Sequence, residues 1–579
     1  MAFFMSNENL IRKAKKLLEQ GNLPKLQKVL STFPASLLRQ KLELELAVAV
    51  RQGLAIEVRE ALFDEYIAQF RNNCSAHNLL LAALVKVELS KWPEAGQLAK
   101  TVLEKNINSS ERLSALEISL LAAFNTKNFQ LARNYFELIS DQNHPAFAGQ
   151  KMMEWDLLLS SSENRHERVI EVWQGLGLVE RCAVGDINNL LAPVLKAYLA
   201  YDRVDEAKAV AETYDLEEKY NSGSGLMLSE LFKASGEFEK ARLILVSIIQ
   251  TKASVPEAEW NLALLELTMG NLDSGWEHYK ARWRWDDFTS PRRYFDSTWW
   301  DGIHDLNGKS VLIWGEQGVG DQLRFLTLLP NFLKAYPSVS VFLEIDERLC
   351  PIVARWYPEA TVQPYGPYDT RGQTSYSCFD YHFPSGDLGI YFFNTEEKLA
   401  ASKFRALRVP DATKQQLMRP LHDLGFERFV GICWRSSLLT ATRVQHYFSV
   451  EGFMTILKDL PDDVGLICLQ IDLTTEERAF LSNDRRVYIP DIDFFQNIDA
   501  HAIYAGSCDI LVTCRSIVAT LAGLFGVPVI SWMKWEDPTF LGQELHPWFP
   551  NRFDVKTRPG FDKRALARRL KDVVDKYFS

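Results

Sequence analysis

A glycine-rich segment follows a short apolar run in the middle of the chain: SVLIW is succeeded by GEQGVGD, residues 315–321. Three glycines let the backbone turn tightly and approach a ligand, and the helix expected from about Asp321 offers backbone N–H groups. The glycine spacing fits neither the GxGxxG dinucleotide fingerprint nor a P-loop, which needs Gly-Lys-Ser/Thr. Asp321 either caps its helix or acts as a general base that deprotonates an acceptor hydroxyl.

A second set of polar residues follows apolar runs nearer the C-terminus. FVGICW is followed by Arg435 and Ser436, where the guanidinium either pairs with phosphate oxygens or lies on the surface. DILVTC is followed by Arg515 and by a helix that opens at Ser516. Backbone amides at that helix start, with nearby hydroxyl groups, are suited to hold a pyrophosphate. After VYIP, the segment 491–497 (DIDFFQN) either contacts a base or ribose or forms a plain acidic loop.

The cysteines show no metal-site or redox pattern. None forms a CxxC pair, and none has a histidine at zinc-finger spacing. Several lie in apolar runs, as in VGICW and LICLQ, which is typical of reduced, buried thiols. The eight are Cys74, Cys182, Cys350, Cys378, Cys433, Cys468, Cys508 and Cys514.

The sequence predicts that the first half of the chain consists of helical repeats. A polar turn and a helix start recur in DRVDEAKAVAETY, GEFEKARLILVSI and GNLDSGWEHYKARW. Their small residues Ala207, Ala241 and Gly275 stand 34 residues apart, the length of a tetratricopeptide (TPR) unit. We expect about eight hairpins in a curved solenoid with a concave, protein-binding surface, an irregular helical domain being the alternative. The same frame fits Leu26, Val58, Ala95, Ala132 and Val169 at less regular intervals.

The second half alternates strand and helix patterns, which predicts two doubly wound parallel sheets. We expect the halves to join near 408–420 and to leave a cleft at the carboxyl ends of their strands. The expected strands are 310–314, 339–345, 429–434, 464–470, 487–490, 509–514 and 527–532. The expected helices begin near Asp321 and cover 348–356, 450–460, 516–525 and 562–578.

Composition narrows the function classes. The 579 residues are 47% hydrophobic and 24% charged, which excludes a mainly disordered chain. A formal net charge of -10 argues against sequence-independent nucleic-acid binding. No run of 18 apolar residues occurs, and residues 1–7 (MAFFMSN) lack the basic start and length of a signal peptide. We therefore expect a cytoplasmic protein without a membrane span or a nucleic-acid partner.

Four segments resemble bacterial TPR proteins with a C-terminal glycosyltransferase domain: AEWNLALLELTMGNLDSGWEHYKARW, GKSVLIWGEQGVGDQLRFLTLLP, VGICWRSS and VTCRSIVATLAGLFGVP. That domain is similar to the GT-B fold of the heptosyltransferase family and, more distantly, to the O-GlcNAc transferases. The resemblance covers roughly residues 222–579 by motif and the earlier repeats only by period. Some proteins with this arrangement modify flagellin or other secreted polypeptides.

The resemblance also implies site residues. Asp321 matches the acidic residue that serves as base in the heptosyltransferase relatives, and Arg435 stands where they place a basic residue near the donor phosphates. Residues 515–523 match the donor-binding DTxxxHLAG pattern with two departures: Arg515 replaces the aspartate and Thr520 replaces the histidine. A third departure is YFS at 447–449 in place of an RS pair. An arginine at this helix start favours an anionic donor, such as a nucleotide-activated acidic sugar.

We therefore expect an α solenoid of TPR-like hairpins followed by an α/β GT-B fold of two Rossmann-like halves. The expected boundaries are 1–285 for the repeat domain, 286–308 for a linker, 309–410 for the first half and 411–579 for the donor-binding half. The acceptor-side loop would comprise Glu316, Gln317, Gly318 and Gly320. The donor-binding residues would be Trp434, Arg435, Ser436, Gln470, Thr513, Arg515, Ser516 and Thr520.

The expected activity is inverting, metal-independent transfer of a sugar from a nucleotide-sugar donor to Ser or Thr of a protein acceptor. Flagellin is one candidate acceptor, the TPR surface would recruit it, and no cofactor is expected beyond the donor substrate. A degenerate transferase kept as a protein-binding scaffold is the main alternative, because Arg515 and Thr520 depart from the donor-binding pattern. A transferase acting on a carbohydrate or lipid is the third.

Overall fold

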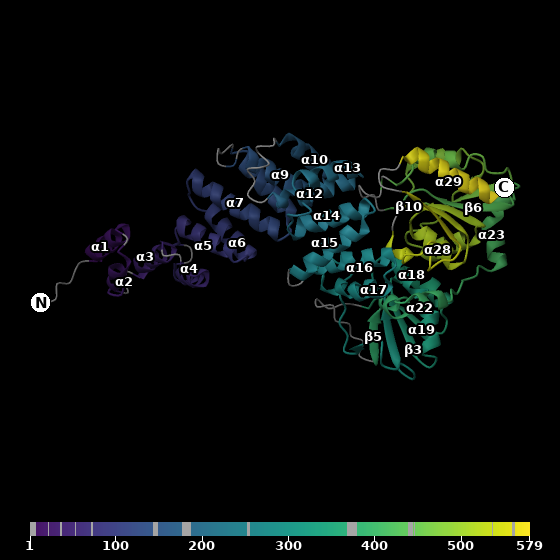
Figure 1. Ribbon diagram of the computed structural model, residues 1–579, viewed down its shortest axis with the longest axis horizontal. Coiled ribbons are helices and arrows are strands. Elements are labelled where there is room, and N and C mark those ends of the chain that lie inside the picture. Colours follow the sequence, from purple (N-terminus) through teal and green to yellow (C-terminus); the bar gives the residue numbers. More distant parts are fainter. Residues whose placement is uncertain are drawn as a thin grey trace. The chain divides into compact units, whose positions relative to one another are not determined.

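The computed structural model describes most of the chain (Figure 1). The described residues are 7–20, 22–34, 38–51, 54–70, 73–142, 147, 149–176, 187–251, 255–366, 379–437, 444, 446–534, 537–557 and 562–578. Cys182 and Cys378 lie outside these ranges. Where it is described, the chain has no helix long and apolar enough to cross a membrane.

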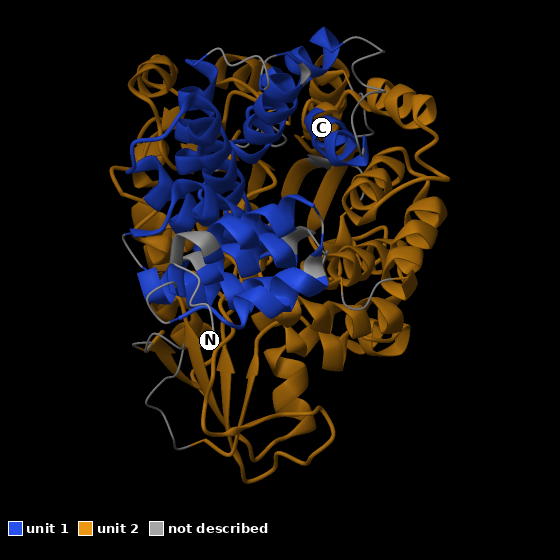
Figure 2. Cartoon of the chain, turned by 90° about the vertical axis from the view of Figure 1, so that its left-hand side faces the viewer, with its two compact units in different colours: residues 1–197 blue, residues 198–579 orange. Residues whose placement is uncertain are grey.

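The chain divides into two compact units, residues 1–197 and 198–579 (Figure 2). The first unit is helical in its described part, and helix α12 spans the division. Its helices are α1 (Asn7–Glu19), α2 (Leu23–Leu30), α3 (Leu38–Arg51), α4 (Ile56–Phe70), α5 (Ala76–Glu88), α6 (Trp92–Leu103), α7 (Ser109–Asn125), α8 (Phe129–Ser140), α9 (Gln150–Ser162), α10 (His166–Gly175) and α12 (Asn188–Ala200).

The second unit begins with two further helical hairpins and half of another. These helices are α13 (Val204–Thr213), α14 (Ser222–Ala234), α15 (Phe238–Thr251), α16 (Pro256–Met269) and α17 (Leu272–Tyr279), followed by the 3-10 turn η4 (Lys280–Arg284). In chain order the described helices thus form eight pairs, as the repeat frame predicts.

The repeat positions identified in the sequence, from Leu26 to Gly275, fall at the same place in nearly every helix pair. That place is the fourth residue of the second helix. Ala95, Ala132 and Ala207 are there and are fully buried, because the two helices of a hairpin approach closely at that point. At Gly275 a Cβ would lie 2.8 Å from the side chain of Leu267, so only glycine fits. Val58 is the exception: it is the third residue of α4 and is 47% exposed, so its place in the frame was wrong. Its helix buries Phe63 and Tyr66 instead.

The first sheet has five parallel strands in the order β1-β5-β2-β3-β4. The strands are β1 (Thr298–Trp299), β2 (Ser310–Trp314), β3 (Ser340–Ile345), β4 (Thr361–Pro364) and β5 (Tyr381–Pro384). Its helical segments are α18 (Val319–Leu326), α19 (Leu329–Ala335), η5 (Glu347–Leu349), α20 (Cys350–Trp356), α21 (Asp387–Phe392) and α22 (Glu396–Ala401).

The second sheet has six parallel strands in the order β11-β10-β9-β6-β7-β8. The strands are β6 (Arg428–Cys433), β7 (Val464–Cys468), β8 (Val487–Tyr488), β9 (Ile510–Cys514), β10 (Val529–Lys534) and β11 (Arg552–Thr557). Its helical segments are α23 (Asp411–His422), α25 (Val450–Ile456), α26 (Thr475–Ser482), α27 (Ile498–Ser507), α28 (Ile517–Leu524), η6 (Pro538–Phe540) and α29 (Lys563–Phe578).

The element order and the two sheets give the chain a TPR-plus-GT-B architecture. All seven predicted strands are present to within a few residues, and α23 occupies the predicted join between the halves. The sequence patterns missed β1, β4, β5 and β11, which are short or carry polar residues such as those of RFDVKT.

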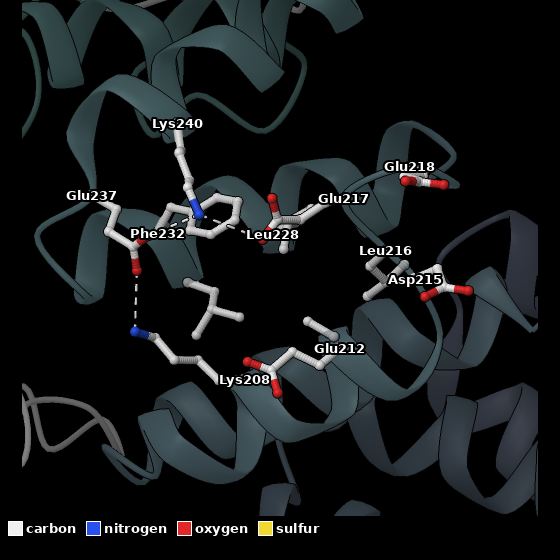
Figure 3. A pocket seen from close by; sticks show the side chains of 12 residues that line it. Lys208, Glu212, Asp215, Leu216, Glu217, Glu218, Leu228, Phe232, Glu237 and Lys240 are labelled. Carbon is white, nitrogen blue, oxygen red and sulfur yellow. Dashed lines mark hydrogen bonds and ion pairs between the residues drawn. The ribbon is translucent and has the colours of Figure 1, made fainter.

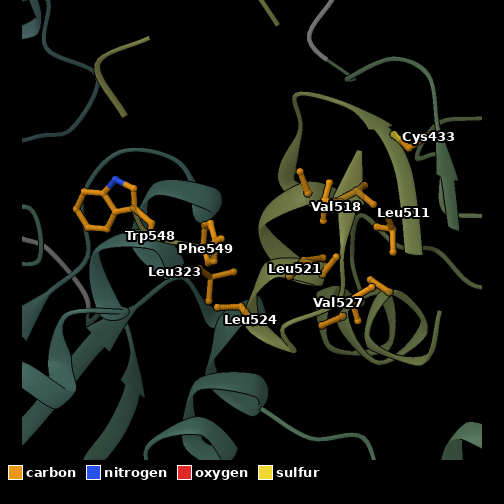
Figure 4. Packing of buried hydrophobic residues seen from close by; sticks show 14 of the residues in the cluster. Leu323, Cys433, Leu511, Val518, Leu521, Leu524, Val527, Trp548 and Phe549 are labelled. Carbon is orange, nitrogen blue, oxygen red and sulfur yellow. The ribbon is translucent and has the colours of Figure 1, made fainter. Parts of the chain in front are cut away.

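One hydrophobic cluster connects the last hairpin with both sheets. It runs from Ala263 and Trp276 through Leu323 of α18 to Leu524 of α28 and beyond. Figure 4 shows Leu323 beside Leu524 and Phe549, and the Phe325 and Trp548 rings lie 5.9 Å apart, edge to face. Side chains of the last hairpin and the two Rossmann-like halves therefore pack into a single core.

This packing explains why the compact units divide at 197–198 rather than at 285–286. Trp276 of α17 donates from its indole nitrogen to the carbonyl of Phe393, and its ring occupies the space that a side chain at Gly389 would need. Gly270 and Gly542, both at positive φ, also pack against each other. The boundary expected at 285 marks a change of element type, and the last hairpins belong to the same compact unit as the two Rossmann-like halves.

Candidate functional site

The glycine-rich loop connects β2 to α18 at the carboxyl edge of the first sheet. A Cβ on Gly315 would lie 2.4 Å from Oε1 of Gln322, so a larger residue would displace that side chain. Gln317 adopts a left-handed φ of 61°, and Gly318 is the N-cap of α18. The loop therefore turns sharply into the helix that carries Asp321, as the glycines predict.

Asp321 lies in the first turn of α18, with its side chain 38% exposed. Its Oδ1 accepts a hydrogen bond from Nη2 of Arg324 at 2.7 Å, one helical turn away. The N-cap interaction of α18 is not made by this side chain, because Gly318 holds the cap position. A partly exposed, ion-paired carboxylate beside a glycine loop is placed to meet a ligand.

Glu316 does not face the open side of the loop. Its carboxylate is buried and accepts two hydrogen bonds from Arg282, at 3.2 Å from Nε and 3.1 Å from Nη2. Arg282 also donates from Nη2 to Asp387 Oδ1 at 2.6 Å. Burial, with a contribution from the negative charge of Asp387, raises the pKa of Glu316 to about 7 although Arg282 acts to lower it. Its assignment to the acceptor side needs correction: Glu316 anchors the loop to the end of the repeat helices.

Gln317 is held from the same direction. Its backbone N–H donates to Oγ of Ser290 at 2.5 Å, and its side-chain Nε2 donates to the hydroxyl of Tyr279 at 2.6 Å. Tyr279 ends helix α17, and its hydroxyl also donates to Glu316 Oε1 at 3.4 Å. The last repeat hairpin therefore fixes two consecutive residues of the glycine-rich loop.

A cavity of about 510 Å³ lies under the loop, at the carboxyl ends of β2, β3 and β4. Gly315, Gln317 and Gly318 form one wall, and most of the other side chains are polar. This is the edge of a parallel sheet at which doubly wound folds bind ligands. The remaining lining residues are Thr289, Ser290, Pro291, Arg293, Val319, Gln322, Asp346, Arg348 and Tyr365.

In the second half, Arg435 is already paired. It is largely buried, and its guanidinium donates to both carboxylate oxygens of Glu477, at 2.9 Å from Nε and 2.6 Å from Nη2. Nη2 also donates to the carbonyl of Asp472 at 2.6 Å. These bonds tie the end of β6 to the start of α26, so Arg435 is not a plain surface arginine. Its contact with donor phosphates stays a prediction.

Trp434 and Gln470 serve the same connection. The Trp434 ring is fully buried, and its indole nitrogen donates to Glu477 Oε1 at 3.1 Å. Gln470 Oε1 accepts from the backbone N–H groups of Trp434 and Arg435, at 3.2 and 3.1 Å. These side chains hold the ends of β6 and β7 together and present no free polar group to a donor. Ser436 follows them and is engaged in an interaction of its own.

The start of α28 follows β9 as predicted. Ser516 is the N-cap, and its Oγ accepts from the backbone N–H of Val518 at 3.3 Å. Thr513 is fully buried, and its hydroxyl donates to the carbonyl of Cys514 at 3.0 Å. Thr513 thus stabilises the turn, while Ser516 and Arg515 lie nearer the surface.

The two halves meet where the predicted base and the predicted donor helix come together. A Cβ on Gly320 would lie 3.9 Å from Oγ1 of Thr520, so α18 and α28 are in direct contact. Arg515 lies within electrostatic range of Asp321 and Arg324. Residues that are far apart in sequence therefore come close together where α18 contacts α28.

This junction holds a charge cluster that the sequence did not indicate. Arg515 forms an ion pair with Asp537, and the buried Arg552 donates to Asp554 Oδ1 at 2.9 Å. The side chain of Arg515 is 46% exposed, so it reaches the surface at this junction. Burial, together with the positive charges of Arg552, Arg324 and Arg515, holds the pKa of His546 well below its usual value. His546 is therefore neutral near pH 7.

A smaller cavity of about 100 Å³ lies at the carboxyl ends of β7 and β8. Gln470 and Asp472 line one side, and Asp493 and Phe494 of the DIDFFQN segment line the other. The acidic segment thus borders a pocket at the ligand-binding edge of the second sheet. Among the described residues, no group of three or more His, Cys, Asp or Glu side chains is placed to hold a metal ion.

No protein-family model matches the chain. Protein FlbA of Caulobacter vibrioides is 26% identical over 517 residues, covering 86% of this chain and 80% of FlbA. ADP-heptose LPS heptosyltransferase II of E. coli is 13% identical, with a TM-score of 0.34. The match covers 47% of this chain and 100% of the heptosyltransferase chain. An O-GlcNAc transferase of Thermobaculum terrenum is 10% identical, with a TM-score of 0.24. The match covers 82% of this chain and 94% of the transferase chain. A TPR protein of Parabacteroides merdae is 16% identical, with a TM-score of 0.32. The match covers 44% of this chain and 96% of the TPR protein chain.

Proposed function

We propose that the protein is a glycosyltransferase that moves a sugar from a nucleotide-sugar donor to a Ser or Thr hydroxyl of a polypeptide. The observation that carries the proposal is the meeting of α18 and α28. It places α18, which carries Asp321 in its first turn, against α28, which begins two residues after Arg515. A base and a cation facing one site are what a transfer reaction between an acceptor and a phosphate-activated donor requires.

In the proposed reaction the acceptor oxygen attacks the anomeric carbon from the side opposite the leaving nucleotide. The carbon–oxygen bond to the phosphate breaks, and the bonding pair leaves with the nucleotide. Asp321 takes the hydroxyl proton. Arg515 and the N-terminus of α28 stabilise the negative charge on the leaving phosphate. The reaction inverts the anomeric centre, and the residues assigned to it need neither a metal ion nor a further cofactor.

The donor in this proposal carries an acidic group on its sugar. Arg515 replaces an acidic residue of the resembled pattern and stands half-exposed beside Arg324 and Arg552. An additional carboxylate on the sugar would bind to this charge cluster more tightly than a neutral sugar would. The cavity bordered by Asp493 and Phe494 is the proposed place of the nucleoside. The cavity of about 510 Å³ under the glycine-rich loop is the proposed entry for the acceptor.

The test is transfer to candidate acceptors, with flagellin from the source organism first, followed by intact-mass measurement. Full-length protein is incubated with each acceptor and a panel of neutral and acidic nucleotide sugars. A mass gain equal to one sugar residue, with one donor class only, supports the proposal. The absence of a gain with every donor and acceptor in the panel argues against it.

A catalytically inactive scaffold is the second candidate, and one observation favours it. Arg435, which the resemblance places at the donor phosphates, donates from Nε and Nη2 to Glu477 and from Nη2 to the carbonyl of Asp472. Calorimetry with the same nucleotide sugars separates the candidates. Saturable binding of one nucleotide sugar favours the enzyme, whereas binding of none favours the scaffold.

A further inference from the structure

A pocket in the helical repeats lies outside the proposed transfer site. It has a volume of about 440 Å³ and lies between α13 and α15, the second helices of two successive pairs, with α14 at its floor (Figure 3). We call it the α13–α15 pocket. Its lining residues are Lys208, Ala211, Glu212, Asp215, Leu216, Glu217, Glu218, Leu228, Leu231, Phe232, Glu237 and Lys240.

The floor of the pocket is apolar. Leu228 and Leu231 of α14 are buried, and Phe232 and Ala211 extend the same surface. An aliphatic chain placed in the pocket would therefore contact hydrocarbon along its length.

The lysines of the wall are already neutralised. Lys208 Nζ lies 3.1 Å from Glu237 Oε1, and Lys240 Nζ lies 3.1 Å from Glu237 Oε2 and 3.6 Å from Glu217 Oε1. Lys240 also lies over the Phe232 ring, 4.9 Å from its centre. Two carboxylates are thus committed to two ammonium groups on one side of the pocket.

The rest of the lining carries carboxylates in excess. Figure 3 shows Glu212 beside Lys208 on α13, and Asp215 and Glu218 at the end of the pocket away from Glu237. Within the described ranges, Glu212 and Glu218 form no ion pair, and Asp215 reaches only Lys219, at 3.9 Å. The pocket therefore combines an apolar floor with an unbalanced negative wall.

We propose that the α13–α15 pocket binds a lysine or arginine side chain presented by a segment of a partner polypeptide. The aliphatic stem of such a side chain packs on Leu231 and Phe232, and its cationic head is attracted by the unpaired carboxylates Glu212 and Glu218 of the lining. A neutral or acidic side chain of equal length would pack on the apolar floor but would gain no attraction to the carboxylates. The α13–α15 pocket gives the repeats a chemical preference, for a basic residue, that does not depend on the proposed transfer reaction.

The test uses full-length protein and a fluorine-labelled heptapeptide with one arginine between two leucines. The matched peptide has neutral citrulline in place of arginine. Line broadening in fluorine NMR measures both affinities. We expect the arginine peptide to bind with a dissociation constant of about 1 mM or below, and the citrulline peptide at least about tenfold more weakly. Similar affinities for the two peptides, or no saturable binding of either, would overturn the proposal.

A protein variant supplies the second arm. Glu212→Gln with Glu218→Gln keeps the size of both side chains and removes two charges, so we expect arginine-peptide binding to weaken about fivefold or more. Glu427→Gln with Asp572→Asn removes the same charge from exposed positions outside the pocket and should leave binding unchanged. Melting curves establish that both variants fold. A folded pocket variant that binds like the wild-type protein contradicts the assignment of Glu212 and Glu218.

Discussion

Gly320 of α18 faces Thr520 of α28, with 3.9 Å between Oγ1 of Thr520 and the position of a Cβ on Gly320. This contact joins the helix that follows the glycine-rich loop of the first half to helix α28 of the second half. A methyl group at position 320 makes an ordinary contact with Thr520, whereas a longer side chain has to share the junction of the two helices with it.

A larger residue at position 320 should therefore disturb the site while the fold survives. Gly320→Leu is expected to weaken nucleotide-sugar binding about tenfold or more by pushing the two helices apart. Gly320→Ala, whose Cβ makes an ordinary contact, should bind normally. Calorimetry of both variants measures this. Equal affinities for the leucine and alanine variants would show that the donor does not bind at this junction.

Arg282 should be critical for stability because it neutralises two buried carboxyl groups. Arg282→Met leaves Glu316 and Asp387 without their cation and is expected to lower the free energy of unfolding by about 3–5 kcal/mol. Urea unfolding monitored by tryptophan fluorescence provides the measurement. Adding Glu316→Gln and Asp387→Asn to that variant should recover part of the loss. A triple variant no more stable than Arg282→Met would contradict the shared-cation account.

Arg435 should support the donor edge without touching the donor. Its bidentate pair with Glu477 predicts that Arg435→Ala and Glu477→Ala reduce nucleotide-sugar affinity to a similar extent, because either change releases the end of β6 from the start of α26. Titration calorimetry on the two variants is the measurement. A loss confined to Arg435→Ala would mean that the guanidinium leaves Glu477 and binds the phosphates directly.

Acid should destabilise the protein through buried neutral histidines. Burial lowers the pKa of His501 to about 4, and burial with Arg292 and Arg293 lowers that of His382 to about 4. The unfolded chain takes up these protons near pH 6.5, so the free energy of unfolding falls as the pH drops from about 6.5 to about 4, by about 3 kcal/mol for each histidine. His501→Gln should flatten part of this fall in urea titrations. His304 is exposed, so the His304→Gln variant is the control and should show the full fall in the free energy of unfolding.

The fold was largely predictable because its signals are local. VLIW and ILVTC are buried strands whose hydrophobic runs end in polar turns, and the 34-residue spacing places Ala207 and Ala241 at successive hairpin contacts. The short strand β1 and the polar strand β11 lack such a run. They form strands because the backbone of a neighbouring strand hydrogen-bonds to them, as β10 does to residues 552–557.

The site was predictable only in part. Gly320 lies beside Thr520 because α18 and α28 each follow a parallel strand at its carboxyl end. The roles of Asp321 and Arg515 in a transfer reaction stay predictions. The sequence could not show that Glu316 turns inward to Arg282, because that depends on how the last hairpin packs on the loop. A buried ion pair has no periodicity, and its two partners here are 34 residues apart.

The most direct test of the central claim is the transfer rate of Asp321→Asn in the full-length protein, with the donor and acceptor that give a mass gain. We predict a loss of at least about a hundredfold in kcat, because the acceptor hydroxyl loses its base, with nucleotide-sugar affinity changed little. Melting curves of the variant should match the wild type. Unchanged turnover by a folded Asp321→Asn variant would remove Asp321 from the mechanism and contradict the account.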